Sequence, residues 1–164
     1  MSVRYAMVDS PIGPLRVATS EGALYQIDFP TGSQARPEPG PGWEHDPAAV
    51  SEIATQLDEY FQGRRTRFHV TLARRGTAFQ QAVWDALVAI PYGETTSYGA
   101  IARVIQKPRA VRAVGAANGA NPIPIVVPCH RVVGSNGDLT GFGGGLPTKR
   151  YLLDLEQGHR DLFA

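Results

Sequence analysis

The spacing of apolar residues changes partway along the chain, and this change constrains the fold more than any other feature. In the first part, residues 4–8 and 15–19 read as strands, separated by the turn-forming residues 9–14 with their two prolines and one glycine. In the second part, apolar residues recur at helical spacing. We therefore expect an α+β protein. A small N-terminal αβ domain, an antiparallel sheet plus a helix, covers residues 1–74, and a mainly helical C-terminal domain covers residues 75–164.

One helix is expected to follow the N-terminal sheet. Residues 31–47 are rich in proline and glycine and indicate an exposed connection. Asp46 can then cap a helix that has Pro47 in its first turn. Gly63 ends this helix, and residues 67–72 are expected to return as a strand. The helix carries a stripe of apolar residues, whose aromatic members we expect in the core: Val50, Ile53, Ala54, Leu57, Tyr60 and Phe61.

The C-terminal domain opens with three predicted helices. The first follows Thr77, the second starts at Ser97 and is broken at Lys107-Pro108, and the third covers about residues 109–118 with Gly119 as its C-terminal cap. The second and third helices are short and are joined by a tight turn. This arrangement is typical of a helix-turn-helix, although many helical domains contain such a pair.

The third of these helices is made almost entirely of small side chains, so its surface could approach another surface closely. That surface could be a neighbouring helix of the same domain or a groove of DNA. Arg112 is the long exception, and its planar guanidinium could enter a groove or fill the space that an extruded base leaves. The small residues are Ala110, Val111, Ala113, Val114, Gly115, Ala116 and Ala117.

The overall charge does not indicate a nucleic-acid partner, because the chain has sixteen basic and fifteen acidic residues. Residues 103–131, however, contain five Lys or Arg and no Asp or Glu. Such a stretch suits phosphate contacts, although a solvated surface would look similar. The chain shows neither a charged and apolar leader nor an apolar stretch long enough to cross a bilayer. We therefore expect a cytoplasmic protein without a membrane partner.

Cys129 is the only cysteine, so no disulfide can form within the chain. It lies in Pro-Cys-His-Arg-Val, residues 128–132, directly after the apolar residues 123–127, which we expect to form a buried strand. A lone cysteine is often no more than a small buried hydrophobic residue. Here, the neighbouring imidazole of His130 favours the thiolate, which is the nucleophilic form. The sequence therefore predicts a reactive thiol.

The motif at 128–132, the Asn-Pro-Ile-Pro before it at 121–124 and the Gly-Phe-Gly-Gly-Gly after it at 141–145 resemble the O6-alkylguanine-DNA alkyltransferases, over nearly the whole chain. The Pro-Tyr-Gly-Glu turn at 91–94 and Tyr98 agree with this family. The resemblance implies direct-reversal repair of double-stranded DNA, in which the alkyl group of O6-alkylguanine passes irreversibly to the cysteine in a single turnover. O4-alkylthymine is a second candidate substrate.

The same resemblance implies binding from the minor groove, with the damaged nucleotide flipped out of the stack, and a structural role for the N-terminal domain. No cofactor is implied, and a monomer is expected. Some relatives hold zinc through N-terminal cysteines, which this chain lacks, so no metal is expected.

Four catalytic roles follow from the resemblance. Cys129 would be the nucleophile and His130 its proton acceptor, with a water between them because neighbouring side chains diverge in an extended segment. Glu156, on a predicted helix over 148–157, would turn towards the core and orient the histidine. Asn121 would be the buried amide that pins the turn before the cysteine; an ordinary Asn-Pro turn is the alternative.

The remaining site residues also come from the resemblance. Arg112 would replace the extruded nucleotide, and Tyr98 would press on the target phosphate and donate to the base. Phe142 stands where other members carry tyrosine, so a stacking wall remains without its hydroxyl. The predicted DNA-binding residues are Arg112, Tyr98, Ala113, Ala110 and Arg109. The predicted pocket residues are Tyr98, Val132, Phe142, Gly143 and Gly144.

Two other classes of protein remain as alternatives. A papain-type cysteine hydrolase also pairs cysteine with histidine, but its histidine lies far away in sequence and its cysteine usually opens a helix. Some relatives of the alkyltransferases recognise alkylated guanine without repairing it, and those lack the cysteine nucleophile. The presence of Cys129 therefore favours repair.

Overall fold

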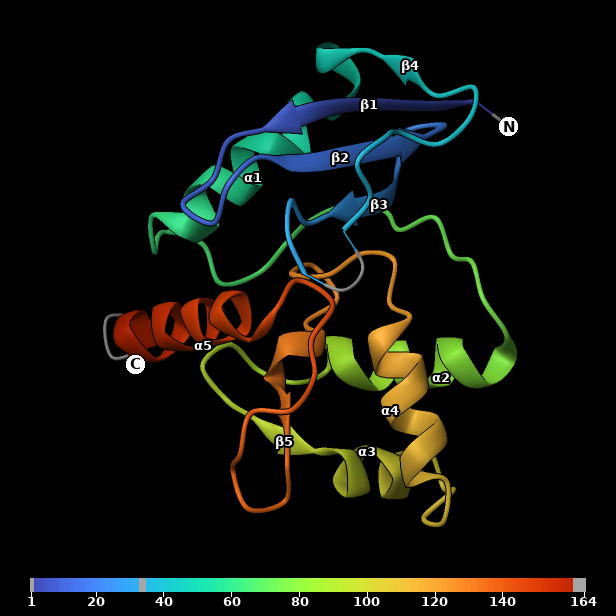
Figure 1. The fold of residues 1–164 in the computed structure, drawn as a ribbon, viewed down its shortest axis with the longest axis vertical. Helices are drawn as coiled ribbons and strands as arrows, with labels where there is room; N and C mark the ends of the chain where they lie inside the picture. Colours follow the sequence, from blue (N-terminus) through green and yellow to red (C-terminus); the bar gives the residue numbers. More distant parts are fainter. Residues whose placement is uncertain (1, 33–34, 161–164) are drawn as a thin grey trace.

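A sheet and a group of helices lie one above the other in the computed structural model, which describes residues 2–32 and 35–160 (Figure 1). The four strands follow the order β3-β2-β1-β4. β1 (Val3–Val8) and β2 (Leu15–Ser20) are antiparallel neighbours, as the turn signals predicted, and β3 (Ala23–Asp28) adds a third antiparallel strand beside β2 that was not predicted. β4 (Glu44–His45) pairs in parallel with β1, inside the segment expected to be only a connection. The sheet is therefore mixed, and the α+β class is confirmed.

The helix of the N-terminal half starts later than expected. A 3-10 turn, Pro47–Val50, comes first, and the helix α1 covers Ser51–Phe61. Asp46 stands at the N-cap position of this 3-10 turn, with Pro47 first in it, but makes no side-chain capping bond; its carboxylate accepts a hydrogen bond of 2.7 Å from Arg4 of β1. The predicted apolar stripe is buried: Val50, Ile53, Leu57, Tyr60 and Phe61 are all nearly inaccessible to solvent.

The strand expected at residues 67–72 is absent from the described chain, and that prediction is wrong. Only Leu72 forms an isolated bridge, with Leu24 of β3. The backbone of His69 bonds to a side chain rather than to a strand: its N–H donates to Gln56 Oε1 and its carbonyl accepts from Gln56 Nε2, each at 2.9 Å. One amide thus satisfies both backbone groups of His69, and the backbone pairs with β3 only at the end of the segment, where the Leu24 N–H donates to the Thr71 carbonyl at 2.8 Å.

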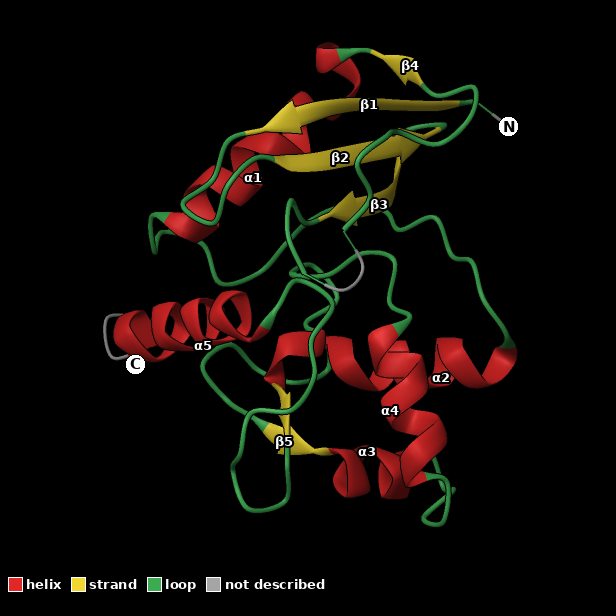
Figure 2. Cartoon of the chain, viewed as in Figure 1, coloured by secondary structure: helices red, strands yellow, loops and turns green. Residues whose placement is uncertain are grey.

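The helices of the C-terminal half agree well with the sequence pattern (Figure 2). α2 (Ala78–Val88) has a complete capping box between Thr77 and Gln80. α3 (Tyr98–Val104) follows a cap in which Ser97 accepts from the Ala100 N–H. α4 spans Val111–Gly119 and α5 spans Leu146–Arg160.

Two details of these helices differ from expectation. α4 begins at Val111 rather than near 109, and Gly119 is its last residue, with Ala120 as the cap. α5 extends beyond the predicted residues 148–157 at both ends. α3 and α4 pack against each other across the connection at 105–110, so the helix-turn-helix arrangement is present. None of the helices in residues 2–32 and 35–160 is long and apolar enough to cross a membrane.

The segment before the cysteine is not the buried strand that its apolar residues predicted. Residues 123–127 form turns, and Ile125 has a positive φ of 73°. The prolines at 122, 124 and 128 remove three backbone donors, which prevents a regular strand. Cys129–Arg131 then forms a 3-10 turn, and the short strand β6 (Val132–Val133) pairs in parallel with β5 (Thr96–Ser97). Ile123, Ile125 and Val127 are buried all the same, which explains the misleading pattern.

Candidate active site

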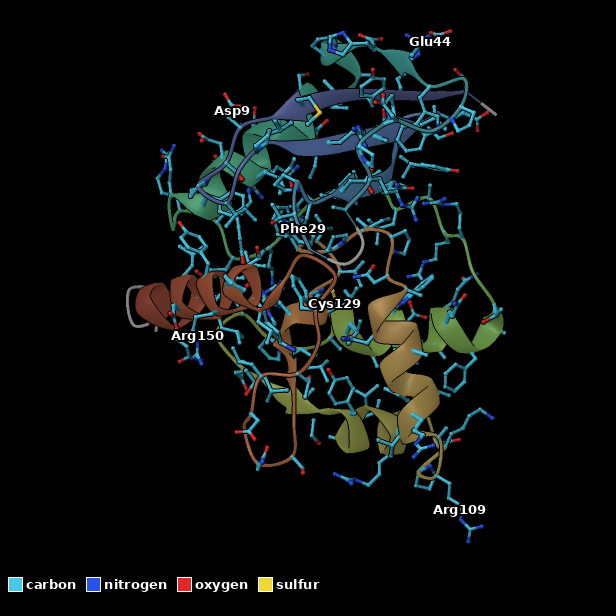
Figure 3. All side chains as sticks on the ribbon, in the orientation of Figure 1. Asp9, Phe29, Glu44, Arg109, Cys129 and Arg150 are labelled. Carbon is cyan, nitrogen blue, oxygen red and sulfur yellow. The ribbon has the colours of Figure 1, made fainter. Side chains whose placement is uncertain are left out.

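Cys129 lies between the two halves of the molecule. Figure 3 places it below Phe29, among the helices that face the sheet. Its side chain is only 5% exposed, and it forms part of the wall of a pocket of about 420 Å³. Phe29 and Arg36 line this pocket from the N-terminal half, and Asn121 and Phe142 line it from the C-terminal half. A substrate can reach the thiol through this pocket.

Asn121 and Asn118 hold the cysteine in place through the backbone. Asn121 Nδ2 donates to the Val127 carbonyl at 2.8 Å, and its Oδ1 accepts from the Ile123 N–H at 3.0 Å. Asn118 Nδ2 donates to the Cys129 carbonyl at 3.3 Å. These bonds fix an otherwise irregular segment, because they use backbone groups that have no sheet partner.

Burial raises the pKa of the Cys129 thiol, while the hydrogen bond with Asn121 and the positive charge of Lys149 act in the opposite direction. The sequence had indicated a thiolate favoured by its neighbours; in the structure, burial has the larger effect. A thiol with a raised pKa gives up its proton only to a base. The site must therefore supply one.

His130 is fully buried and pairs with Glu156. Its Nε2 lies 2.7 Å from Glu156 Oε2, so it is this nitrogen that carries a proton towards the carboxylate. The other ring nitrogen, Nδ1, is buried and has no hydrogen-bond partner in the part of the chain that the structure describes. Burial lowers the pKa of His130, which favours the neutral ring. A neutral imidazole with a free Nδ1 can accept a proton.

Glu156 binds Arg131 as well as His130. Arg131 Nε donates to Oε1 at 2.8 Å and Nη2 donates to Oε2 at 3.0 Å. Burial opposes ionisation of Glu156, but the hydrogen bonds from His130 and Arg131 and the charge of the Arg131 guanidinium outweigh it and hold its pKa well below the usual range. Arg131 also donates to the Ile90 carbonyl at 2.7 Å, so the guanidinium is itself fixed. The carboxylate is a charged anchor for the imidazole.

Lys149 and Tyr60 lie near the site, and the sequence did not indicate either of them there. Lys149 is completely buried, and its Nζ donates to the Val132 carbonyl at 2.7 Å. Its position on α5 was the available signal, because Lys149, Leu152 and Glu156 lie on one helical face. Tyr60 donates to Glu156 Oε2 at 2.6 Å, although its apolar stripe had suggested only core packing. A buried tyrosine usually finds a partner for its hydroxyl, which was the signal in that case.

Lys149→Met is expected to slow alkylation of Cys129 by about tenfold at neutral pH. The methionine keeps the length of the side chain and removes a charge that lowers the pKa of the thiol. The pH at which the thiolate forms should therefore rise, and stopped-flow measurement of iodoacetamide uptake across pH would show this shift. Arg150→Met is a matched control, since Arg150 is exposed on the same helix (Figure 3). Equal rates in the parent and both variants would contradict this role of Lys149.

The pocket has an aromatic wall built from both halves of the chain. The rings of Phe29 and Phe142 are 5.4 Å apart, and Gly143 lines the same pocket. A Cβ on Gly144 would lie 2.7 Å from the Phe29 ring, so only glycine fits there. Phe29 is a wall residue that the sequence did not indicate.

Tyr98, Val132 and Gly144 were also predicted to line the pocket, but the structure does not place them in its wall. The Tyr98 hydroxyl is hydrogen-bonded to the Thr140 hydroxyl. Val132 is buried in β6, where its carbonyl binds Lys149.

α4 has a packed face and an open face. Val114 and Ala117 are buried, and a Cβ on Gly115 would lie 3.9 Å from the Tyr98 ring. Arg112 and Ala113 are exposed, and Arg112 makes no hydrogen bond or ion pair with any described residue. The small residues therefore serve close packing on one face and leave the other face free.

The predicted DNA-binding residues near the start of α4 lie at one end of the molecule. Ala110 is half-buried, whereas Arg109 is exposed and projects from the end farthest from the sheet (Figure 3). No group of three or more His, Cys, Asp or Glu side chains in the described chain could hold a metal ion.

Comparison with known families bears directly on this site. The ribonuclease-like domain of 6-O-methylguanine DNA methyltransferase matches residues 3–73, and the DNA binding domain of 6-O-methylguanine DNA methyltransferase matches residues 78–158. The chain belongs to the 6-O-methylguanine DNA methyltransferase family. The predicted resemblance is thereby confirmed.

Members of this family from distant organisms are similar over almost their full length. The methylated-DNA–protein-cysteine methyltransferase of Mycobacterium tuberculosis is 52% identical over 157 residues, which cover 94% of this chain and 93% of the relative. The enzyme of the same name from Methanosarcina acetivorans is 49% identical over 152 residues, with 93% and 97% covered.

Solved structures of the methyltransferase family share the fold. A crystal structure of the Mycobacterium tuberculosis O6-methylguanine methyltransferase has a TM-score of 0.87 at 50% identity and covers 99% of each chain. The Mycobacterium tuberculosis OGT in complex with DNA has a TM-score of 0.86 at 49% identity and covers 97% of this chain and 94% of that one.

Proposed function

We propose that this methylated-DNA–protein-cysteine methyltransferase repairs O6-alkylguanine by moving the alkyl group irreversibly to Cys129, once per protein molecule. One observation carries the assignment to Cys129: the only thiol of the chain lies in the pocket wall, next in sequence to a buried His130–Glu156 pair. The arrangement supplies a soft nucleophile and a base to activate it.

The proposed reaction is one substitution at the alkyl carbon, with a proton transfer from the thiol before it and a proton transfer to guanine after it. The thiol proton passes through a water to His130 Nδ1, while Glu156 stabilises the resulting imidazolium. The sulfur then attacks the alkyl carbon, the carbon–oxygen bond breaks, and its electrons stay on guanine. Guanine takes up a proton, for which the Tyr98 hydroxyl, bonded to Thr140, is the proposed donor. Water then returns a proton to Tyr98 and removes the one that His130 holds. The products are a thioether and intact guanine, and the thioether has no leaving group that water could displace.

Burial of Cys129 favours a mechanism in which the damaged nucleotide leaves the stack. An alkyl group on a stacked base cannot reach a thiol that is 5% exposed, whereas a flipped base can enter the pocket. The small residues on the open face of α4 suit the narrow minor groove, and Arg112 would fill the space left in the duplex. A relative 49% identical to this chain has been crystallised in complex with DNA, which supports DNA as the partner. We propose that the protein acts as a monomer and that O4-alkylthymine is a second substrate.

Counting repaired lesions per protein molecule tests this function. A duplex with one O6-methylguanine, supplied in excess, should be repaired until one lesion is lost per protein and no further. Continued turnover would contradict irreversible transfer, and no repair at all would contradict the proposed substrate.

Arg112→Ala is expected to reduce repair of duplex DNA by at least about a hundredfold and to leave the reaction with free O6-benzylguanine nearly unchanged. The free base needs no extrusion, so it bypasses the proposed role of Arg112. The ratio of the two rates in parent and variant is the measurement. Arg64→Ala provides the matched control, because Arg64 is exposed in the N-terminal half. If Arg112→Ala lowered both rates equally, arginine-for-base exchange would have to be abandoned.

A further inference from the structure

One oxygen of the buried carboxylate is shared by both halves of the chain. Glu156 Oε2 accepts from His130 Nε2 at 2.7 Å, from Arg131 Nη2 at 3.0 Å and from the Tyr60 hydroxyl at 2.6 Å. Tyr60 belongs to α1 beneath the N-terminal sheet, whereas the other three residues belong to the C-terminal half. The Glu156 carboxylate thus connects the imidazole that receives the thiol proton to a side chain of the N-terminal half.

Packing alone fixes the orientation of the Tyr60 ring, without any contribution from the hydrogen bond of its hydroxyl. The side chain is fully buried, and its ring centroid lies 5.3 Å from Phe61, 5.5 Å from Phe68 and 6.3 Å from Tyr92. A ring held on three sides aims its hydroxyl along one direction. The hydroxyl therefore helps to set where Oε2 lies, together with the fixed Arg131 guanidinium.

Tyr60 is also a permanent donor. Burial, followed by the negative charge and hydrogen bond of Glu156, raises the pKa of Tyr60 well above its usual value. The phenol thus keeps its proton throughout the pH range of the reaction. A hydrogen bond from such a donor to an ionised carboxylate is among the stronger ones in proteins.

We propose that Tyr60 is a positioning residue for alkyl transfer: its hydroxyl fixes and shares the Glu156 oxygen that holds His130, so the N-terminal half takes part in the chemistry. This proposal rests on the proposed function of Cys129 and His130. It differs from the purely structural role that the sequence indicated for this half.

Removing the hydroxyl has a definite electrostatic consequence. The ionisable groups around His130 are Glu156, Arg131, Lys149, Cys129 and, through the carboxylate, Tyr60. A carboxylate that loses one donor becomes a stronger acceptor for those that remain. The Nε2 proton of His130 is then held more tightly, and Nδ1 becomes more basic. The pKa of His130 should rise.

Tyr60→Phe tests the proposal, because it deletes only the hydroxyl and keeps the packed ring. The pKa of His130, followed by NMR of the imidazole, should rise by about half a unit to one unit. The acid limb of the pH–rate profile for O6-benzylguanine should move upward by the same amount. The rate at neutral pH should fall by about three- to tenfold, because the carboxylate no longer holds the imidazole in one position. Tyr5→Phe removes a hydroxyl from β1 in the same half and should leave both measurements at the parental values.

A second variant should shift the pKa of His130 in the opposite direction, and it remains informative if Tyr60→Phe folds poorly. With 3-fluorotyrosine at position 60, the phenol is more acidic and donates more strongly, so the pKa of His130 should fall. An unchanged His130 pKa in either folded variant would overturn the proposal. Failure of the proposed function is a different result, since the parent would then not become alkylated while the NMR titration could still be measured.

Discussion

Cys129→Ser is expected to abolish alkyl transfer, with a rate at least about a thousandfold below the parent. A hydroxyl is a far weaker nucleophile than a thiol, and the buried His130–Glu156 pair is arranged to remove one proton rather than to activate an alcohol strongly. The serine is nearly isosteric, and the Cys129 backbone bonds to Asn118 and Val127 do not involve the side chain. Fold and DNA binding should therefore persist.

The measurement pairs two assays on the same variant. Transfer of radiolabelled methyl from duplex DNA to protein should be undetectable, while fluorescence anisotropy should give parental affinity for an O6-methylguanine duplex. Measurable methyl transfer by Cys129→Ser would mean that another residue is the acceptor. Loss of both repair and binding would point to an unfolded variant, which circular dichroism would reveal.

Glu156→Gln is expected to have the second largest effect, on both stability and chemistry. The neutral amide cannot balance the positive charge of Arg131 or of protonated His130. It leaves the Arg131 guanidinium buried without its counter-charge. Breaking a buried pair of this kind typically costs about 3–5 kcal/mol of stability. Alkyl transfer should slow by at least about a hundredfold, because the imidazolium loses its anchor.

The stability difference between parent and Glu156→Gln should depend on pH. Glu156 is held ionised in the folded protein by a lowered pKa, so its contribution is complete above the ordinary pKa of a carboxylate. The contribution declines as the pH falls through and below that range. Urea titrations should therefore show a gap in unfolding free energy that narrows in acid.

Asp154→Asn is the control for this experiment, since Asp154 is exposed on the same helix. It should show parental stability and rate at every pH. A gap for Glu156→Gln that stayed constant down to strongly acidic pH would contradict an ionised buried carboxylate. A parental transfer rate in a folded Glu156→Gln protein would leave that carboxylate a structural role only.

The sequence predicted local structure well wherever neighbouring residues decide it. The helix that follows Thr77, the helix that starts at Ser97 and the inward azimuth of Glu156 on its helix all depend on residues within two turns. The two wrong strands, at 67–72 and 123–127, share one cause. Their apolar residues are buried or partly buried, but each segment gives backbone groups to a side-chain amide, of Gln56 or of Asn121, so that no regular strand forms.

The surroundings of the cysteine were harder to predict than the cysteine itself. Cys129 and His130 are adjacent, so a short motif indicates them. Tyr60 is far from Glu156 in sequence, and only the packing of α1 above α5 brings the two together. Phe29 likewise reaches the pocket from the end of β3. Such contacts depend on how the two halves meet, which no local pattern encodes.

Intact-protein mass spectrometry after incubation with an O6-methylguanine duplex tests the central claim most directly. We expect the whole population to gain the mass of one methyl group in place of one hydrogen, and peptide mapping to locate it on Cys129. The oligonucleotide should become unmodified guanine in equal amount. An unchanged protein mass beside a repaired duplex, or a methyl group on any other residue, would contradict transfer to Cys129.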